Sequence, residues 1–408
     1  MLIFHIIDSF NRINNGKYLL RSSNKILKLN NNKILLVGMV DSPHFKKWVS
    51  TVQEEFPNKS VLVFPSDRPR MTVIKKPRSK HKKQNVPRVF KLLINLKLNF
   101  AVFYLLDLAF GIKWRAYFLA RLIIKHKPSI IHFHEMQHGA YIYNLISTYK
   151  KIPTNTRKII STWGSDLTLY SWVDHHQSQL RACFTWVKTL TAERTSELLD
   201  AKRLGFEGEY ISPLYITLGQ NLSEVSKLTI PSTRKVILVK GHQSDTGRAL
   251  NALWAISTLS SHLANFEIIV YSAPVSVQIQ VDILRNKNKI NIRTLARVES
   301  SEMIELFKQA RISVSLAVSD GLPGVLVEAM STGAFPIQSE NSTAQEFLVN
   351  SENGLLVEPW DLISIKESIL KAITDDRLVD QAAVLNRKVL QEKYSLKEGR
   401  LKLRQLYL

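Results

Sequence analysis

Short runs of apolar residues alternate with helix-length segments from residue 34 onward. The runs are rich in Ile, Val and Leu, as in buried strands, and the longer segments repeat apolar residues at helical spacing. This alternation predicts an α/β protein made of repeated β-α units with parallel sheets. In the first half, the expected strands are residues 34–39, 61–64, 130–133, 158–162 and 186–190, with helices such as 44–56 and 192–204. In the second half, the expected strands are residues 236–240, 266–271, 290–292, 312–316 and 335–338, separated by helices 249–262, 301–310, 325–332 and 363–374.

The 408-residue length predicts two domains, because single domains commonly hold about 100–200 residues. Residues 215–234 are polar, contain Pro231 and interrupt the alternation, which is typical of a linker. Tandem α/β domains bind ligands at the carboxyl edges of their sheets. The predicted parts are an extension at 1–32, a first domain at 33–215 with a basic insertion at 68–110, a linker at 216–235, a second domain at 236–390 and a C-terminal helix at 391–408, for which packing back on the first domain is one option.

Two acids flank a glycine-containing turn near the end of the second domain. Asp320 is followed by Gly321 and Gly324, and Glu328 lies on the apolar helix that runs towards the last strand of this series. A helix N-terminus offers free backbone N–H groups that attract phosphate, and glycines let a ligand approach the backbone closely. Carboxylates can bind sugar hydroxyls. The arrangement therefore predicts a nucleotide-sugar site, although an ordinary helix start with Asp320 as its cap is the alternative.

This motif resembles that of the family-4 retaining glycosyltransferases, within the glycosyl transferases group 1. Their signature is an acid, seven residues, then Glu-Ala-Met and a small-residue turn into a strand; this chain has Asp320, then Glu328-Ala329-Met330 and Gly333. The family's first acid is usually Glu, which is one methylene longer than Asp320. The resemblance implies the GT-B fold, in which two Rossmann-like domains face each other across a cleft.

The resemblance also implies roles for individual residues. Asp320 would contact the donor sugar and Glu328 the ribose of the nucleotide. The backbone amides of Gly321, Leu322 and Gly324 would support the sugar or the diphosphate. No cofactor and no metal would be required.

A second loop, residues 240–248, leaves the first strand of the second domain and opens a helix. Family members place basic residues here, and fixed cations stabilise the charge that develops on a departing diphosphate. Arg248, at the helix start, is the first candidate, and Lys240 or His242 is the second. A solvated loop with a chance arginine is the alternative.

Histidines cluster at the end of strand 130–133, at positions 132, 134 and 138. Zinc is the weaker interpretation, because no cysteine accompanies them. Residues 132 and 134 of a strand point to the same side, so we expect both at the edge of the cleft. The resemblance implies that His134 meets the donor sugar near the reacting carbon. Glu135 is a candidate for the acceptor side.

Two other strand-to-helix turns of the first domain supply further acceptor-side candidates. Asp166 lies in a Gly-Ser-Asp turn, where it could orient an acceptor hydroxyl or a neighbouring histidine, or simply cap a helix. Asp41 and His44 lie in the turn after the first strand and are assigned to acceptor contact.

The formal net charge of +22 is concentrated in one place. Eleven basic residues and no acid lie between Arg68 and Lys97, which is half of the excess. In residues 89–106, apolar residues are interspersed with Lys91, Asn95, Lys97 and Asn99, which predicts an amphipathic helix with cations on one side. Such a stretch favours an anionic membrane leaflet, bound through residues 68–106. A solvated insertion is the alternative, and nucleic acid is not expected, because no recognition motif accompanies the charge.

The remaining features concern location. The single cysteine, Cys183, excludes an internal disulfide and fits a reducing compartment, where a buried thiol is expected. The chain shows neither a signal peptide nor a stretch of about 18 apolar residues, the length that spans a membrane. We therefore expect a cytoplasmic protein that associates peripherally with the inner face of the membrane.

Together these features predict an enzyme that moves a sugar from a nucleotide diphosphate-sugar to a glycan or lipid-linked acceptor. The resemblance implies retention of anomeric configuration, and with the basic stretch it suggests bacterial surface polysaccharide or lipopolysaccharide synthesis with a polyprenyl-diphosphate-linked acceptor. Two alternatives stay open. One is a non-catalytic basic adaptor that binds membrane or nucleic acid, and the other is a GT-B nucleotide-sugar epimerase.

Overall fold

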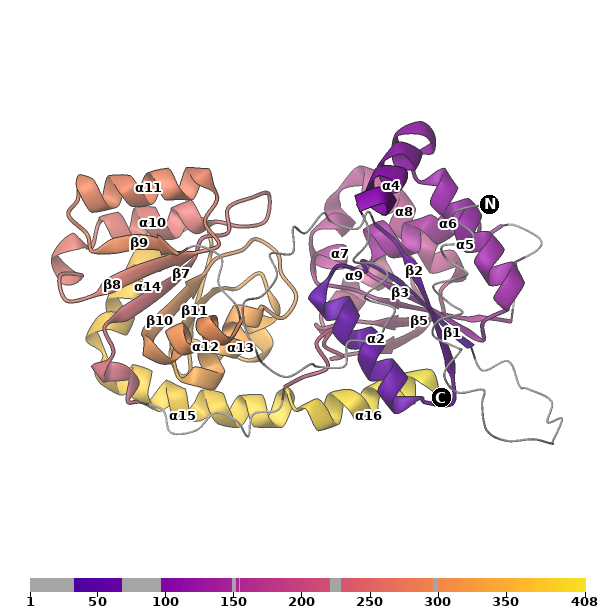
Figure 1. Cartoon of the computed structure of the whole chain (residues 1–408). Helices are drawn as coiled ribbons and strands as arrows, with labels where there is room; N and C mark the ends of the chain where they lie inside the picture. The colour runs from indigo at the N-terminus through magenta and orange to yellow at the C-terminus, as the bar shows by residue number, and fades with distance from the viewer. Residues whose placement is uncertain (1–32, 68–96, 149–151, 154, 221–228, 296–299) are drawn as a thin grey trace, which may run out of the picture. The chain divides into compact units, whose positions relative to one another are not determined.

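The computed structural model describes residues 33–67, 97–148, 152–153, 155–220, 229–295 and 300–408. These residues form two compact units. The N-terminal unit extends to Thr217 and includes Leu403–Leu408, and the C-terminal unit is Leu218–Lys402. Each unit is a parallel β-sheet with helices on both faces (Figure 1). Among the helices that the structure describes, none has both the length and the apolar character that a membrane span requires.

The described part of the N-terminal unit contains a sheet with strand order β2-β1-β3-β4-β5-β6, paired in parallel throughout. Its strands are β1 Lys33–Gly38, β2 Ser60–Pro65, β3 Ile130–His134, β4 Arg157–Ser161, β5 Thr189–Thr191 and β6 Glu209–Ile211. Its helices are α2 Pro43–Glu55, α4 Lys97–Phe110, α5 Lys113–His126, the π-helix η1 Met136–Ala140, α6 Tyr141–Asn144, α7 Ser165–Thr168, the 3-10 helix η2 Tyr170–Trp172, α8 Asp174–Trp186 and α9 Glu197–Arg203.

The two faces of this sheet differ in chemistry. Side chains alternate along a strand, so Ile131 and Phe133 pack into an apolar core with α5, α6 and α8, while His132 and His134 point to the face that α2 covers. The end of α16 (Leu396–Tyr407) belongs to this polar face as well. Tyr407 is fully buried, and its hydroxyl lies 3.0 Å from Trp48 Nε1 and 2.5 Å from His132 Nδ1.

The C-terminal unit repeats the plan with strand order β12-β11-β10-β7-β8-β9. One face of β7 adds Ile237 and Val239 to a core with α10, α11 and α14, and the other face adds Leu238 to a core with α12 and α13. Its strands are β7 Val236–Lys240, β8 Glu267–Tyr271, β9 Ile292–Leu295, β10 Ala310–Ser315, β11 Phe335–Ser339 and β12 Leu355–Val357. Its helices are η4 Pro231–Thr233, α10 Ala249–Ser257, η5 Ser260–His262, α11 Val275–Asn286, α12 Ser300–Gln309, α13 Gly324–Thr332, η6 Thr343–Glu346, α14 Leu362–Thr374, α15 Asp376–Lys393 and most of α16.

The predicted α/β class with parallel sheets is confirmed, and most predicted strands lie within one or two residues of the observed ones. The strand expected at 186–190 is wrong in its first half. Trp186 ends α8 instead, because its ring packs 4.6 Å from that of Tyr143 and its Nε1 donates to Asn144 Oδ1 at 2.7 Å. The helix expected at 192–204 begins only at Glu197. Cys183 is buried, as predicted.

Most of the basic stretch that we predicted to bind membrane, residues 68–96, lies outside the described residues. The described α4 overlaps the predicted amphipathic helix at 97–106 and continues to Phe110.

Candidate functional site

Three predicted residues of the C-terminal unit lie together at the carboxyl end of its sheet. Lys240 ends β7, Asp320 lies between β10 and α13, and Glu328 lies on α13. Lys240 Nζ is 3.8 Å from Asp320 Oδ2. Burial raises the pKa of Glu328 to about 7, and the charge of Lys240 opposes this rise. One ammonium group therefore interacts with both carboxylates, and we call these three residues the donor cluster.

Tyr271, at the end of β8, lies near the donor cluster. Tyr271 pairs with Lys240 in the strand register, and its hydroxyl is buried with no hydrogen-bond partner among the described residues. Burial, and next the charge of Glu328, raise the pKa of Tyr271 well above its usual value. A buried hydroxyl without a partner is costly, and a bound ligand would satisfy it.

The N-terminus of α13 lies next to the donor cluster. Pro323 precedes the helix with extended backbone, and no side chain caps it. A Cβ atom added at Gly324 would meet nothing within 4 Å, so this first turn borders open space. The uncapped N–H groups and the positive end of the helix dipole make a place for a phosphate. Gly321 and Leu322 form the turn that leads into it.

The loop after β7 requires its glycines. A Cβ at Gly241 would lie 2.8 Å from the carbonyl oxygen of Tyr271, and one at Gly247 would lie 2.3 Å from that of His242. Ring nitrogen Nε2 of His242 lies 3.0 Å from Ser244 Oγ. Burial, and next the charge of Lys240, lower the pKa of His242, so a neutral ring is favoured here.

Arg248 closes the same loop. Its Nη1 donates to the carbonyl oxygens of Ser244 at 2.8 Å and Gly247 at 2.7 Å, and its Nη2 donates to that of Asp245 at 3.1 Å. Its guanidinium carbon lies 4.1 Å from the centre of the Trp360 ring. Arg248 thus holds the loop in shape, while Lys240 is the predicted cation that faces the two acids.

The two strand histidines of the N-terminal unit are buried side by side, with ring centres 4.2 Å apart. His132 is fully bonded, since its Nδ1 contacts the Tyr407 hydroxyl and its Nε2 lies 2.7 Å from Ser161 Oγ. Neither ring nitrogen of His134 has a hydrogen-bond partner among the described residues. Burial lowers the pKa of His134 to about 3, so its ring is neutral. It lies 4.9 Å from the ring of Trp48.

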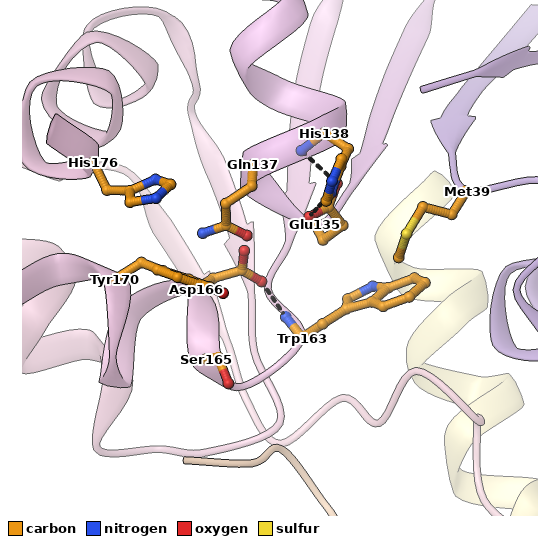
Figure 2. Close-up of a pocket in the computed structure, with 9 residues that line it drawn as sticks. All are labelled: Met39, Glu135, Gln137, His138, Trp163, Ser165, Asp166, Tyr170 and His176. Carbon is orange, nitrogen blue, oxygen red and sulfur yellow. Dashed lines mark hydrogen bonds and ion pairs between the residues drawn. The ribbon is translucent and has the colours of Figure 1, made fainter. Parts of the chain in front are cut away.

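A cavity of about 370 Å³ opens at the carboxyl ends of strands β1, β3 and β4. Figure 2 shows side chains from several turns converging on it, with Asp166 and Gln137 near its centre. Its lining residues are Met39, Glu135, Gln137, His138, Trp163, Ser165, Asp166, Tyr170 and His176.

The two acids of this cavity are held by backbone amides. Asp166 accepts a hydrogen bond from the N–H group of Met136 at 3.0 Å. It accepts a second one from the N–H group of Trp163 at 2.5 Å (Figure 2). Glu135 Oε1 accepts from the N–H groups of His138 at 2.7 Å and Gly139 at 2.9 Å. Burial, and next the charge of Glu135, raise the pKa of Asp166 to about 7.

Comparison with known proteins identifies the C-terminal unit. Residues 222–389 match the model of the family described as glycosyl transferases group 1. These residues are a glycosyl transferases group 1 domain. The prediction that the chain is a glycosyltransferase is thereby confirmed. No curated protein matches the sequence.

Solved structures that resemble the whole chain share the GT-B fold, so the predicted fold is confirmed. Sucrose-phosphate synthase from Thermosynechococcus elongatus is 13% identical over 92% of this chain and 98% of its own, with a TM-score of 0.65. A glycosyltransferase from Rickettsia africae is 16% identical over 93% and 98%, with a TM-score of 0.60. Anabaena HepE in complex with UDP is 11% identical over 92% and 99%, with a TM-score of 0.63. At these identities the likeness establishes the fold.

The predicted acceptor-side residues of this glycosyltransferase fall into two groups. Glu135 and Asp166 line the cavity, whereas Asp41 and His44 are outside its described lining. The His44 ring contacts the edge of Trp163 at 6.3 Å between centres. Asp41 lies near Asp67, whose pKa rises to about 6, mainly through burial. The roles assigned to these four residues, and to His134 and Arg248, stay predictions.

Sequence reasoning missed several lining residues of the glycosyltransferase. Trp163 directly precedes the Gly-Ser-Asp turn from which Asp166 was predicted as a site residue. Tyr170 and His176 follow that turn and lie together, with ring centres 4.6 Å apart. A search for aromatic side chains within ten residues after each strand end would have found Trp163 and Tyr170, whereas His176 lies further along the chain.

Proposed function

We propose that the protein transfers a sugar from a nucleotide diphosphate-sugar to a hydroxyl of a glycan or lipid-linked acceptor, with retention of configuration. The observation that carries this proposal is the donor cluster beside the uncapped N-terminus of α13. It joins a cation, two carboxylates and a helix N-terminus without a side-chain cap, the groups that a diphosphate and a sugar require.

Each part of the donor cluster has a chemical task in this proposal. The α13 amides hold the diphosphate, and Lys240 stabilises the charge that grows on it as it leaves. Asp320 accepts hydrogen bonds from the sugar hydroxyls and Glu328 from the ribose. Because these fixed groups supply the positive charge, we propose that no metal is needed. The leaving oxygen then receives the proton of the acceptor hydroxyl.

The cavity of the N-terminal unit is proposed as the acceptor site. It combines the aromatic rings of Trp163 and Tyr170 with a few fixed polar groups, the usual composition of a site for a small ligand. We propose a role in bacterial surface polysaccharide synthesis, which rests on the family resemblance.

Exposed apolar side chains support membrane association of the N-terminal unit. Leu105, Leu108 and Phe110 on α4 are exposed at 61%, 73% and 60%, and Tyr117 on α5 is also exposed. We propose that this surface, next in sequence to the basic stretch, enters the interface of an anionic leaflet on the cytoplasmic side.

Vesicle sedimentation tests the membrane proposal. Leu108→Asp should lower binding to vesicles that contain phosphatidylglycerol by about tenfold, because a charge replaces an inserted side chain. Leu199→Asp is the matched control, since Leu199 on α9 is 74% exposed in the same unit. Equal binding by both variants would contradict the proposed surface.

Nucleotide titration tests the central proposal. The full chain is titrated with UDP, GDP and dTDP, and the one that binds is then offered as its glucose or mannose derivative with a panel of sugar acceptors. Binding at micromolar concentration and transfer to an acceptor support the enzyme. Absence of nucleotide binding would favour the adaptor, and conversion of the donor sugar without any acceptor would favour the epimerase.

A further inference from the structure

One titratable side chain of the acceptor cavity has a fixed orientation. His138 Nδ1 lies 3.1 Å from Glu135 Oε2, while the backbone N–H of His138 donates to the other oxygen of that carboxylate (Figure 2). An ionised carboxylate only accepts hydrogen bonds, so Nδ1 carries the proton. Atom Nε2 of the neutral ring is then a hydrogen-bond acceptor. The side chain is 56% exposed and lines the cavity.

Glu135 is itself held rigidly. Its backbone has φ 64° and ψ 161°, a conformation that is unusual for a residue with a side chain. Such a conformation is costly and persists where its surroundings fix it. Here three hydrogen bonds to the carboxylate, from two amides and one imidazole, fix it. The same carboxylate therefore fixes the orientation of the His138 imidazole.

We propose that Nε2 of His138 accepts a hydrogen bond from the attacking hydroxyl of the acceptor, with Glu135 as the positioning residue. This inference rests on the proposed function. As the bond from the acceptor oxygen to the sugar carbon forms, the bond from that carbon to the diphosphate oxygen breaks. Nε2 takes up the hydroxyl proton as the new bond forms and then passes it to the leaving oxygen, so the ring is neutral again at the end of the transfer.

The charges around His138 make this role dependent on pH. The hydrogen bond to Glu135 raises the pKa of His138, burial opposes the rise, and the charges of Glu135, Asp67 and Asp166 add to it. A protonated ring would donate from Nε2 and could no longer accept. Transfer should therefore fall as the pH decreases through the raised pKa of His138.

The experiment compares variants of the full chain over pH 5 to 9. The donors are UDP-glucose, GDP-mannose and dTDP-glucose, and the acceptors are p-nitrophenyl glycosides and water. His138→Phe should lower transfer by about 10²-fold, because the nucleophile loses its orientation. His138→Gln, whose amide oxygen can accept but does not titrate, should restore part of the rate and remove the part of the acid limb that His138 causes, leaving the part that protonation of Glu328 causes. His175→Gln is the control outside the cavity lining and should keep the wild-type profile.

Each outcome decides the question. Nucleotide binding at the donor cluster with an unchanged profile in His138→Phe would overturn the role of His138 and leave the proposed function standing. A wild-type chain that turns over none of the donors would overturn the proposed function, and this inference with it. Glu135→Gln tests the positioning role independently. Without the charge of Glu135 the pKa of His138 should be lower, so the acid limb should move to lower pH and still be present.

Discussion

The donor cluster and the acceptor cavity occupy equivalent places in two similar sheets, yet they are built differently. Asp320 and Glu328 belong to one turn and the helix that follows it, and Lys240 ends a neighbouring strand. The cavity draws its walls from turns after three strands and from two further helical turns. In the donor cluster, the two acids are close because they are close in the sequence. In the acceptor cavity, the acids are brought together by the order of the strands in the sheet. In each region burial raises the pKa of one acid to about 7, Glu328 in the cluster and Asp166 in the cavity, and in the cluster the charge of Lys240 opposes this rise.

Replacement of Glu328 should lower donor turnover more than the other replacements. If it did not, the comparison between donor cluster and acceptor cavity would fail. Glu328→Gln keeps the shape and removes the charge that Lys240 faces, so turnover of the donor should fall by about 10²–10³-fold. Steady-state kinetics with the best donor would measure it. Glu367→Gln, an exposed acid on α14, should keep wild-type turnover. Comparable rates in the two variants would remove Glu328 from the donor site.

The C-terminal unit could be predicted largely from sequence for a physical reason. Strand β7 was placed at its observed bounds, because Ile237 to Val239 form an apolar run that ends at a loop requiring Gly241. The approach of Lys240 to Asp320 follows from the parallel order, since β7 and β10 are neighbours and their ends meet at one edge. The hydrogen bonds from Arg248 to the carbonyl oxygens of its own loop could not be predicted in this way, because they depend on the path of the loop backbone.

The N-terminal unit was harder to predict because its chemistry is distributed. Periodicity placed His132 and His134 on one face, but it gave no sign that Tyr407, far along the chain, would cover His132. Trp186 was assigned to a strand because its partners, Tyr143 and Asn144, are invisible to a local pattern. Long-range contacts of this kind decide whether an apolar residue such as Trp186 belongs to a helix or to the strand that follows it.

The pH dependence of stability should sharpen the contrast between the units. The folded-state pKa of Asp166 is raised to about 7, so the folded protein holds a proton that the unfolded chain releases near pH 4. Stability from this group is therefore fully present at low pH and is lost as the pH rises towards 7, by roughly a few kcal/mol. Urea unfolding followed by tryptophan emission reports mainly on this unit, which holds five of the seven tryptophans.

The variant Asp166→Asn isolates the contribution of Asp166 to the pH dependence of the unfolding free energy. The variant cannot ionise at this position, so its unfolding free energy should change less between pH 5 and pH 8 than that of the wild type. Its absolute stability should be lower, because the amide nitrogen cannot accept from a backbone N–H. An identical pH slope in both proteins would assign the dependence to other buried acids such as Glu197.

Tyr407→Phe should have the smallest effect, and it tests whether the polar face of the N-terminal sheet depends on the last turn of the chain. The change removes one hydroxyl that contacts both Trp48 Nε1 and His132 Nδ1, and it leaves these two buried groups without that partner. Each unsatisfied buried group costs about 1–3 kcal/mol, which predicts a loss of that order in the free energy of unfolding. Nucleotide binding should not change, because the donor cluster lies in the other unit. Tyr117→Phe, at an exposed tyrosine, is the control for removal of a hydroxyl. If both variants were equally stable, the C-terminal turn would be an accessory to the fold, and the burial of His132 would rest on α2 alone.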